Sequence, residues 1–159
     1  FGGVVTGTLM WYFKATLEQV IMLISFIPVI TGMGGNVGGQ TSTILVRGFA
    51  TGKIDFANLR QVFLKELRVG LIMGTICGVV IAAVAMVWHQ NYFLGLVVGL
   101  AMVTAITVAA CMGVIVTAFF KRVGIDPAIA SSPFVQTVND ITGISIYFVT
   151  GSLFLKYLI

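Results

Sequence analysis

The sequence predicts an all-α integral membrane protein, built as one domain over residues 1–159 with five transmembrane helices. Of the 159 residues, 58% are hydrophobic and 9% are charged, whereas an ordinary soluble domain is about 25% charged. Three apolar runs, 69–88, 92–120 and 127–159, are long enough for a spanning helix, which needs about 20 mostly apolar residues. No linker or repeat divides the chain, so we expect one compact membrane domain.

The first two spans are less regular than the other three. Residues 1–13 are apolar but short, and we expect a truncated first helix belonging to a fragment of a longer protein. Residues 17–45 are long enough to span but carry glycines and amides. Residues 50–67 have hydrophobic side chains at helical spacing between charges, which predicts a short interfacial helix that runs into span three, with Asp55 as its N-cap.

The loops and their charges indicate how the spans are arranged. The tight loop 89–91 makes spans three and four antiparallel neighbours, and Asp126 before Pro127 marks the start of span five. Seven of the nine Lys and Arg residues lie in 47–68 or 121–122, and the positive-inside rule assigns these loops to the cytoplasm. We therefore expect a multi-pass protein of the cell (inner or plasma) membrane with a cytoplasmic N terminus.

Several function classes do not fit the sequence. The net charge of +4 lacks the clustered basic stripe with aromatics that nucleic-acid binding uses, so no nucleic-acid partner is expected. No Ser/His/Asp set, HExxH or phosphate-binding loop is present, so the chain is not expected to be an enzyme. Cys77 and Cys111 lie inside apolar spans without disulfide or metal spacing, as small buried residues do.

Asp140 is a lone carboxylate in the middle of span five, with no Lys or Arg within fifteen positions on either side. A charge at the centre of a membrane helix costs about 2.5 to 3.5 kcal/mol and usually faces a bundle interior or a water-filled path. Gln136 and Ser132 lie one and two turns before it and Gly143 one turn after it, on the same helical face, with Asn139 at the border. The alternative is a buried structural carboxyl.

Span two carries a second polar face. Asn36, Gln40 and Thr43 follow one another at helical spacing, and glycines such as Gly32 either allow close helix packing or bare backbone carbonyls. The alternative is a packing face with amides joining helices. Oxygen ligands suit hard cations, and Mg²⁺ keeps several waters while taking one or two carboxylates. One Asp per chain becomes a pair in a homodimer, so we hypothesise a symmetric pore lined by spans two and five.

Three stretches of sequence resemble the membrane domain of the MgtE magnesium channels. They are GMGGNVGGQTSTILVRG (32–48), FLKELRVG (63–70) and GIDPAIASSPFVQTVNDITGISIYF (124–148), and the resemblance covers nearly the whole chain in order and spacing. It implies a homodimer in the lipid bilayer, with five spans per subunit and a cation pore at the dimer interface. The family's cytoplasmic N-terminal and CBS sensor domains are absent from this chain. They are expected as regulatory domains of the full-length protein, so Mg²⁺ feedback gating is not assigned to these residues.

The resemblance also implies roles for individual residues. Asp140 would hold hydrated Mg²⁺, helped by backbone oxygens at positions matching Ser132 and Gln136, while Gly32, Asn36 and Gln40 would line the cytoplasmic side of the pore. Relatives often have Gly or Asn where this chain has Ser132, so only a backbone role is carried over to that position.

The function expected from these features is a Mg²⁺-selective channel that conducts divalent cations into the cytoplasm, with Mg²⁺ as both transported ion and ligand of the Asp140 site. The alternative is a proton- or cation-coupled secondary transporter that uses Asp140, although no inverted repeat is visible. A non-transporting membrane scaffold is a third class. Ion flux with and without Asp140→Asn separates the scaffold from the other two.

Overall fold

The computed structural model describes residues 2–14 and 21–154, apart from the side chains of residues 129–132, and over this range it is all helical. The predicted all-α fold class is therefore confirmed. In chain order the elements are α1 (Gly2–Tyr12), the 3₁₀ helix η1 (Ile21–Phe26), α3 (Ile27–Ala50), α4 (Leu59–His89), α5 (Tyr92–Arg122) and α6 (Pro127–Leu153).

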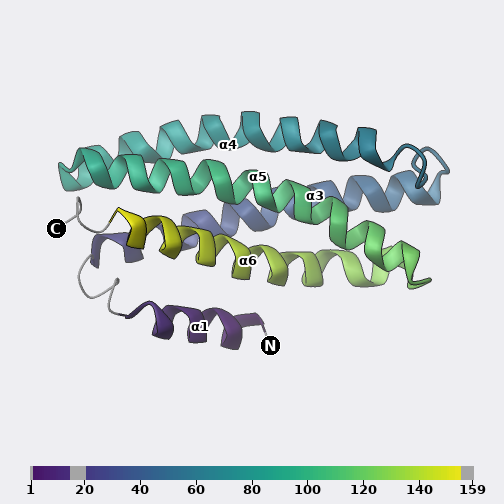
Figure 1. Ribbon diagram of the computed structural model, residues 1–159, viewed down its shortest axis with the longest axis horizontal. Coiled ribbons are helices and arrows are strands. Elements are labelled where there is room, and N and C mark those ends of the chain that lie inside the picture. Colours follow the sequence, from purple (N-terminus) through teal and green to yellow (C-terminus); the bar gives the residue numbers. More distant parts are fainter. Residues whose placement is uncertain (1, 15–20, 155–159) are drawn as a thin grey trace.

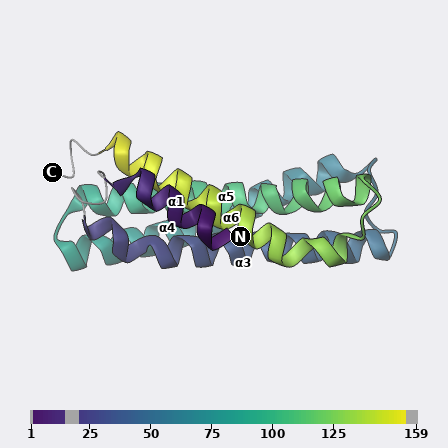
Figure 2. The same ribbon diagram turned by 90° about the horizontal axis from the view of Figure 1, so that it is seen from below.

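The four long helices run along the long axis of the molecule (Figure 1), and the view from below shows the same alignment (Figure 2). Helix α5 is central, because it packs against α3, α4 and α6 and contributes a continuous series of buried apolar side chains such as Val97, Met102 and Ile106. Helix α4 packs mainly along α5, and α1 packs against α6. Helices α3, α4 and α6 therefore each bury one face against α5.

Three helical stretches in the described range are long and apolar enough to cross a membrane: Ile21–Ala50, Leu59–His89 and Tyr92–Arg122. At about 1.5 Å per residue, a helix of 31 residues is about 46 Å long, which exceeds the hydrocarbon core of about 30 Å. Helix α6, with 27 residues, is not among these three stretches. The membrane character is confirmed, whereas the count of five spans, the truncation of the first and the topology stay predictions.

The connections agree with the sequence in two places and differ in one. The turn between α4 and α5 is tight: Gln90 has φ 50°, and the Asn91 side chain accepts a hydrogen bond of 3.1 Å from the Leu94 amide. These two helices are antiparallel neighbours, as predicted. Asp126 caps α6 by accepting a hydrogen bond of 2.9 Å from the Ala128 amide, also as predicted.

The prediction of a helix over the whole of 50–67 is wrong for its first half. Helix α3 continues to Ala50, a turn follows in which Gly52 has φ 69°, and α4 begins only at Leu59. Asp55 is not the N-cap of α4, because its side chain accepts from the Asn58 amide at 2.9 Å while its own amide donates to the Asn58 side chain at 3.0 Å. This reciprocal pair folds the segment into a turn and leaves Asn58 at the N-cap position.

Glycines allow α4 and α5 to pack backbone to backbone. Gly70, Gly74 and Gly78 lie one helical turn apart on the buried face of α4. A Cβ added at Gly74 would lie 2.9 Å from the backbone oxygen of Val103, and one at Gly78 would lie 2.9 Å from that of Gly99. Small residues at such spacing are typical of membrane helices in close contact. The short distance between α4 and α5 therefore depends on glycine, which has no side chain, at these positions.

We expect Gly74→Ala to lower the free energy of unfolding by about 1 to 2 kcal/mol, because the new methyl group meets backbone that cannot move aside. Unfolding of the purified chain in mixed micelles, titrated with denaturing detergent, measures this. Gly7→Ala is the matched control, since nothing lies within 4 Å of a Cβ added there; it should be neutral or slightly stabilising. Equal effects of the two substitutions would contradict the close contact.

Candidate cation site

The polar face of α3 lies on the outside of the protomer. Asn36, Gln40 and Thr43 are all exposed, whereas the opposite side of the helix is buried against α5 and α6. Gly32 is half-buried at the start of this stripe, and nothing lies within 4 Å of a Cβ added to it. The helix therefore presents two amides and a hydroxyl to whatever covers this face of the molecule.

Asp140 lies on α6, beside this face. It is half-buried, and the Gln136 side chain, one turn earlier on the same helix, lies beside it. Gln136 in turn packs directly on Gly35 of α3, where any Cβ would collide with its amide group. Because Gly35 is the neighbour of Asn36, the Gln136–Asp140 pair lies alongside α3 at the level of Asn36.

Asn139 points elsewhere. Its side chain is 1% exposed and packs on Gly38 of α3, close to α5, and neither its Oδ1 nor its Nδ2 atom has a hydrogen-bond partner among the described residues. Gly143 is also buried, facing Ile30 of α3. Asp140 and Gln136 thus lie close to the exposed stripe of α3, whereas the Asn139 side chain points into the contact between α6 and α3. The pore-lining roles of Asn139 and Gly143 stay predictions.

Ser132 belongs to α6, but its side chain lies outside the described part of the chain. Its neighbour Pro133 is exposed within the helix. A proline inside a helix has no backbone N–H to donate, so the carbonyl one turn earlier loses its helical partner. The N-terminal part of α6 therefore contains a backbone carbonyl without its usual helical partner.

A buried carboxylate that the sequence analysis missed lies behind α3. Glu66 of α4 is 4% exposed and accepts a hydrogen bond of 2.8 Å from the Thr41 hydroxyl. Ser42 follows Thr41 on α3, and its hydroxyl lies 2.8 Å from the Thr117 hydroxyl of α5. Its helical spacing indicates that Glu66 is buried, because it lies one turn before Gly70 on the same small-residue face of α4. Hydroxyl groups of α3 are thus anchored to two other helices.

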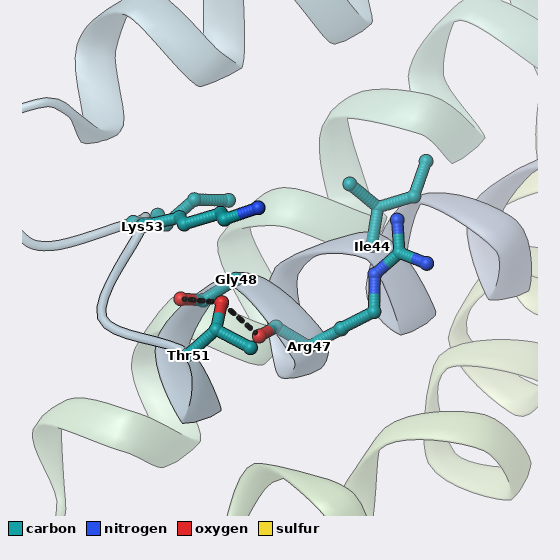
Figure 3. A pocket seen from close by; sticks show the side chains of 6 residues that line it. Ile44, Arg47, Gly48, Thr51 and Lys53 are labelled. Atoms are coloured by element: carbon teal, nitrogen blue, oxygen red, sulfur yellow. Dashed lines mark hydrogen bonds between the residues drawn. The ribbon is translucent and has the colours of Figure 1, made fainter.

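A hollow at the end of α3 does not suit a cation. It has a volume of about 430 Å³ and lies at the C-terminal end of α3, lined by Ile44, Arg47, Gly48, Thr51, Lys53 and Ile54. Figure 3 shows the Arg47 side chain extending toward Ile44 and Lys53 on the side of Gly48, while the Thr51 hydroxyl donates to the Arg47 carbonyl at 2.9 Å. Two positive charges repel a metal ion, so this hollow is a poor cation site.

The chemistry around Asp140 is that of oxygen ligands with a single carboxylate. Among the described residues, no group of three or more His, Cys, Asp or Glu side chains could hold a metal ion. One carboxylate and one amide cannot replace the hydration shell of a divalent cation, but they can accept hydrogen bonds from its bound waters. Mg²⁺ dehydrates reluctantly and usually keeps several of its waters when a protein binds it.

Comparison with known proteins gives concordant matches. Residues 27–150 match the family model MgtE, described as a divalent cation transporter. The chain is 36% identical over 159 residues to the magnesium transporter MgtE of Enterococcus faecalis, and 32% identical over 158 residues to that of Bacillus subtilis. It is 36% identical over 154 residues to that of Thermus thermophilus. These alignments cover 97 to 100% of this chain but only 34 to 35% of each relative. The chain thus spans about a third of their length.

We expect Thr41→Val to lower the free energy of unfolding by about 1 to 3 kcal/mol, because it leaves the buried Glu66 carboxyl without its hydroxyl partner. The double substitution Thr41→Val with Glu66→Leu should recover much of this loss, since both polar groups are then gone. Denaturing-detergent titrations of the single and double variants measure the coupling.

Thr104→Val is the control for this pair, because the exposed Thr104 hydroxyl bonds only to the Leu100 carbonyl of its own helix. It should change stability by less than about 0.5 kcal/mol. Additive effects of Thr41→Val and Glu66→Leu would show that the two side chains do not interact.

Proposed function

The chain belongs to the MgtE family of divalent cation transporters, and from that premise we propose that it forms a Mg²⁺-selective channel which conducts the ion into the cytoplasm as a homodimer. The observation that carries this proposal is the position of Asp140, a half-buried carboxylate paired with Gln136 beside the exposed amide stripe of α3.

The exposed stripe of α3 favours a shared pore over a lipid-facing surface. Asn36 and Gln40 are exposed on the protomer within a helix that is long and apolar enough to span the membrane. Amide groups facing hydrocarbon would have no hydrogen-bond partners, and irregular or polar surfaces are tolerated at membrane depth where they line protein or water. Two protomers that meet on this side would enclose both stripes in one polar path.

The same arrangement supplies the second carboxylate. One Asp140 per protomer becomes a pair across the dimer axis, and two carboxylates suit an ion that keeps most of its waters. The Gln136 amide, one turn before Asp140 on the same helix, lies beside that carboxylate and adds a polar group to the site. Backbone oxygens at Ser132 and Gln136 extend the set of acceptors around the hydrated ion. A monovalent cation would interact with the same pair through half the charge and be held less tightly.

The direction of transport follows from the membrane potential. Moving one charge through 100 mV is worth about 2.3 kcal/mol, so a divalent ion gains about 4.6 kcal/mol on entering a negative interior. No coupled ion is needed for uptake under this driving force. The channel proposal therefore requires only a path with a selective site and no proton transfer at Asp140.

We expect Asp140→Asn to lower Mg²⁺ flux into vesicles by about tenfold or more and to reduce the preference for Mg²⁺ over K⁺, because each dimer loses both carboxylates. Flux of the reconstituted chain, followed with an indicator dye at fixed membrane potential, measures this. Asp55→Asn is the control: it removes the same charge from an exposed turn and should leave flux unchanged.

Two outcomes would contradict the proposal. Unchanged Mg²⁺ flux in Asp140→Asn would remove Asp140 from the site. Flux in the unaltered chain that follows an imposed pH gradient, and not the Mg²⁺ equilibrium potential, would identify a coupled transporter instead of a channel.

A further inference from the structure

The outer face of α4 is an open apolar surface of the bundle. The helix lies along one edge of the molecule (Figure 1) and packs mainly against α5. The other side of α4 carries a series of exposed hydrophobic side chains, among them Ile72, which is 61% exposed, Ile76 and Val80. A helix of this composition that spans a membrane presents such a face to lipid.

The N-terminal turns of α4 carry a basic hollow on this face. It has a volume of about 350 Å³ and is lined by Gln61, Leu64, Lys65, Arg68, Val69 and Ile72. Lys65 and Arg68 are both exposed. Glu66, the one acidic residue of residues 59–72, points to the opposite side of the helix, where its carboxylate is bonded to Thr41. The two cations of the hollow are therefore not neutralised on their own face.

The hollow lies about one hydrocarbon thickness along α4 from an exposed aromatic pair. Trp88 follows Arg68 by twenty residues and is 69% exposed, close to the exposed Tyr92. At about 1.5 Å per residue, Arg68 and Trp88 are about 30 Å apart along the helix, which matches the thickness of the hydrocarbon core. Exposed aromatic residues are enriched at the membrane interface. If Trp88 marks one interface, Lys65 and Arg68 lie at the other.

The hollow also continues into an apolar groove. A second hollow adjoins the basic one and shares Ile72 with it. It has a volume of about 310 Å³ and is lined by Leu71, Ile72, Thr75 and Ile76. It leads along the helix toward the centre of the membrane. A basic pocket above an apolar groove has the polarity of a phospholipid, with its charged phosphate at the surface and its acyl chain below.

We propose that this face of α4 binds one anionic phospholipid, whose phosphate is held by Lys65 and Arg68 and whose acyl chain lies against Ile72 and Ile76. Gln61, one turn before Lys65, is placed to donate a hydrogen bond to the headgroup. Basic clusters next to a transmembrane helix attract anionic lipids, and here the groove adds apolar contact for the chain. The site is separate from Asp140 and does not depend on ion conduction.

Native mass spectrometry of the purified chain, titrated with dioleoyl phosphatidylglycerol, tests the proposal. We expect one phosphatidylglycerol per chain to bind about tenfold more tightly than phosphatidylcholine, and Lys65→Gln with Arg68→Gln to lose about that preference. Lys121→Gln with Arg122→Gln removes the same charge from exposed positions at the end of α5 and should retain the lipid. Lys65→Arg with Arg68→Lys keeps the charge and should also retain it.

Other occupants of this face give different results. Glycerol phosphate that binds as tightly as the intact lipid would exclude the acyl-chain contact and overturn the proposal. Equal binding of phosphatidylglycerol and phosphatidylcholine would also overturn it. So would a Lys65→Gln, Arg68→Gln variant that binds phosphatidylglycerol as tightly as the Lys121→Gln, Arg122→Gln control. A change in the number of chains per particle in that variant would mean that a second copy covers the face. If the double variant does not fold, Lys65→Gln and Arg68→Gln are measured singly, and each should lose part of the preference.

Discussion

The contact between two glycines of α3 and two amide side chains of α6 determines where the polar groups of the bundle point. Gln136 lies on Gly35 and Asn139 lies on Gly38, with no room for a Cβ at either glycine. A Cβ at either glycine would displace the amide group that lies on it, and at Gly38 it would also meet the Ala109 backbone oxygen at 2.9 Å. Close approach is useful here because interhelical packing in lipid relies on van der Waals contact between small residues.

Helix α3 carries polar side chains on two opposite faces, and the two sets differ in their hydrogen-bond partners. Behind the helix, Thr41 and Ser42 are buried and bonded to Glu66 and Thr117. In front, Asn36 and Gln40 are exposed in the protomer. The hydroxyls behind thus hold the helix in place, while the amides in front are free to interact with water, an ion or a second protomer. Our proposal of a hydrated-ion path depends on this division.

The sequence was sufficient for features set by local chemistry and insufficient for those set by neighbours. The start of α6 at Pro127 and the tight turn before α5 were predicted from caps and loop length. The turn after Ala50 was missed, because apolar spacing suggested a helix while Gly52 and the Asp55–Asn58 pair favour a turn. Periodicity groups residues on a face but does not say what that face meets, so the inward position of Asn139 could not be predicted.

The central question is whether the exposed face of α3 that carries Asn36 and Gln40 meets water or lipid. Thiol labelling answers it most directly. In a background with Cys77→Ala and Cys111→Ala, Gln40→Cys and Ile76→Cys would be exposed to a charged, membrane-impermeant reagent in lipid vesicles. The account predicts that Gln40→Cys is modified at least about tenfold faster, since thiols react in water and not in hydrocarbon, and that Mg²⁺ slows the reaction. Equal rates at the two positions, or faster modification of Ile76→Cys, would contradict it.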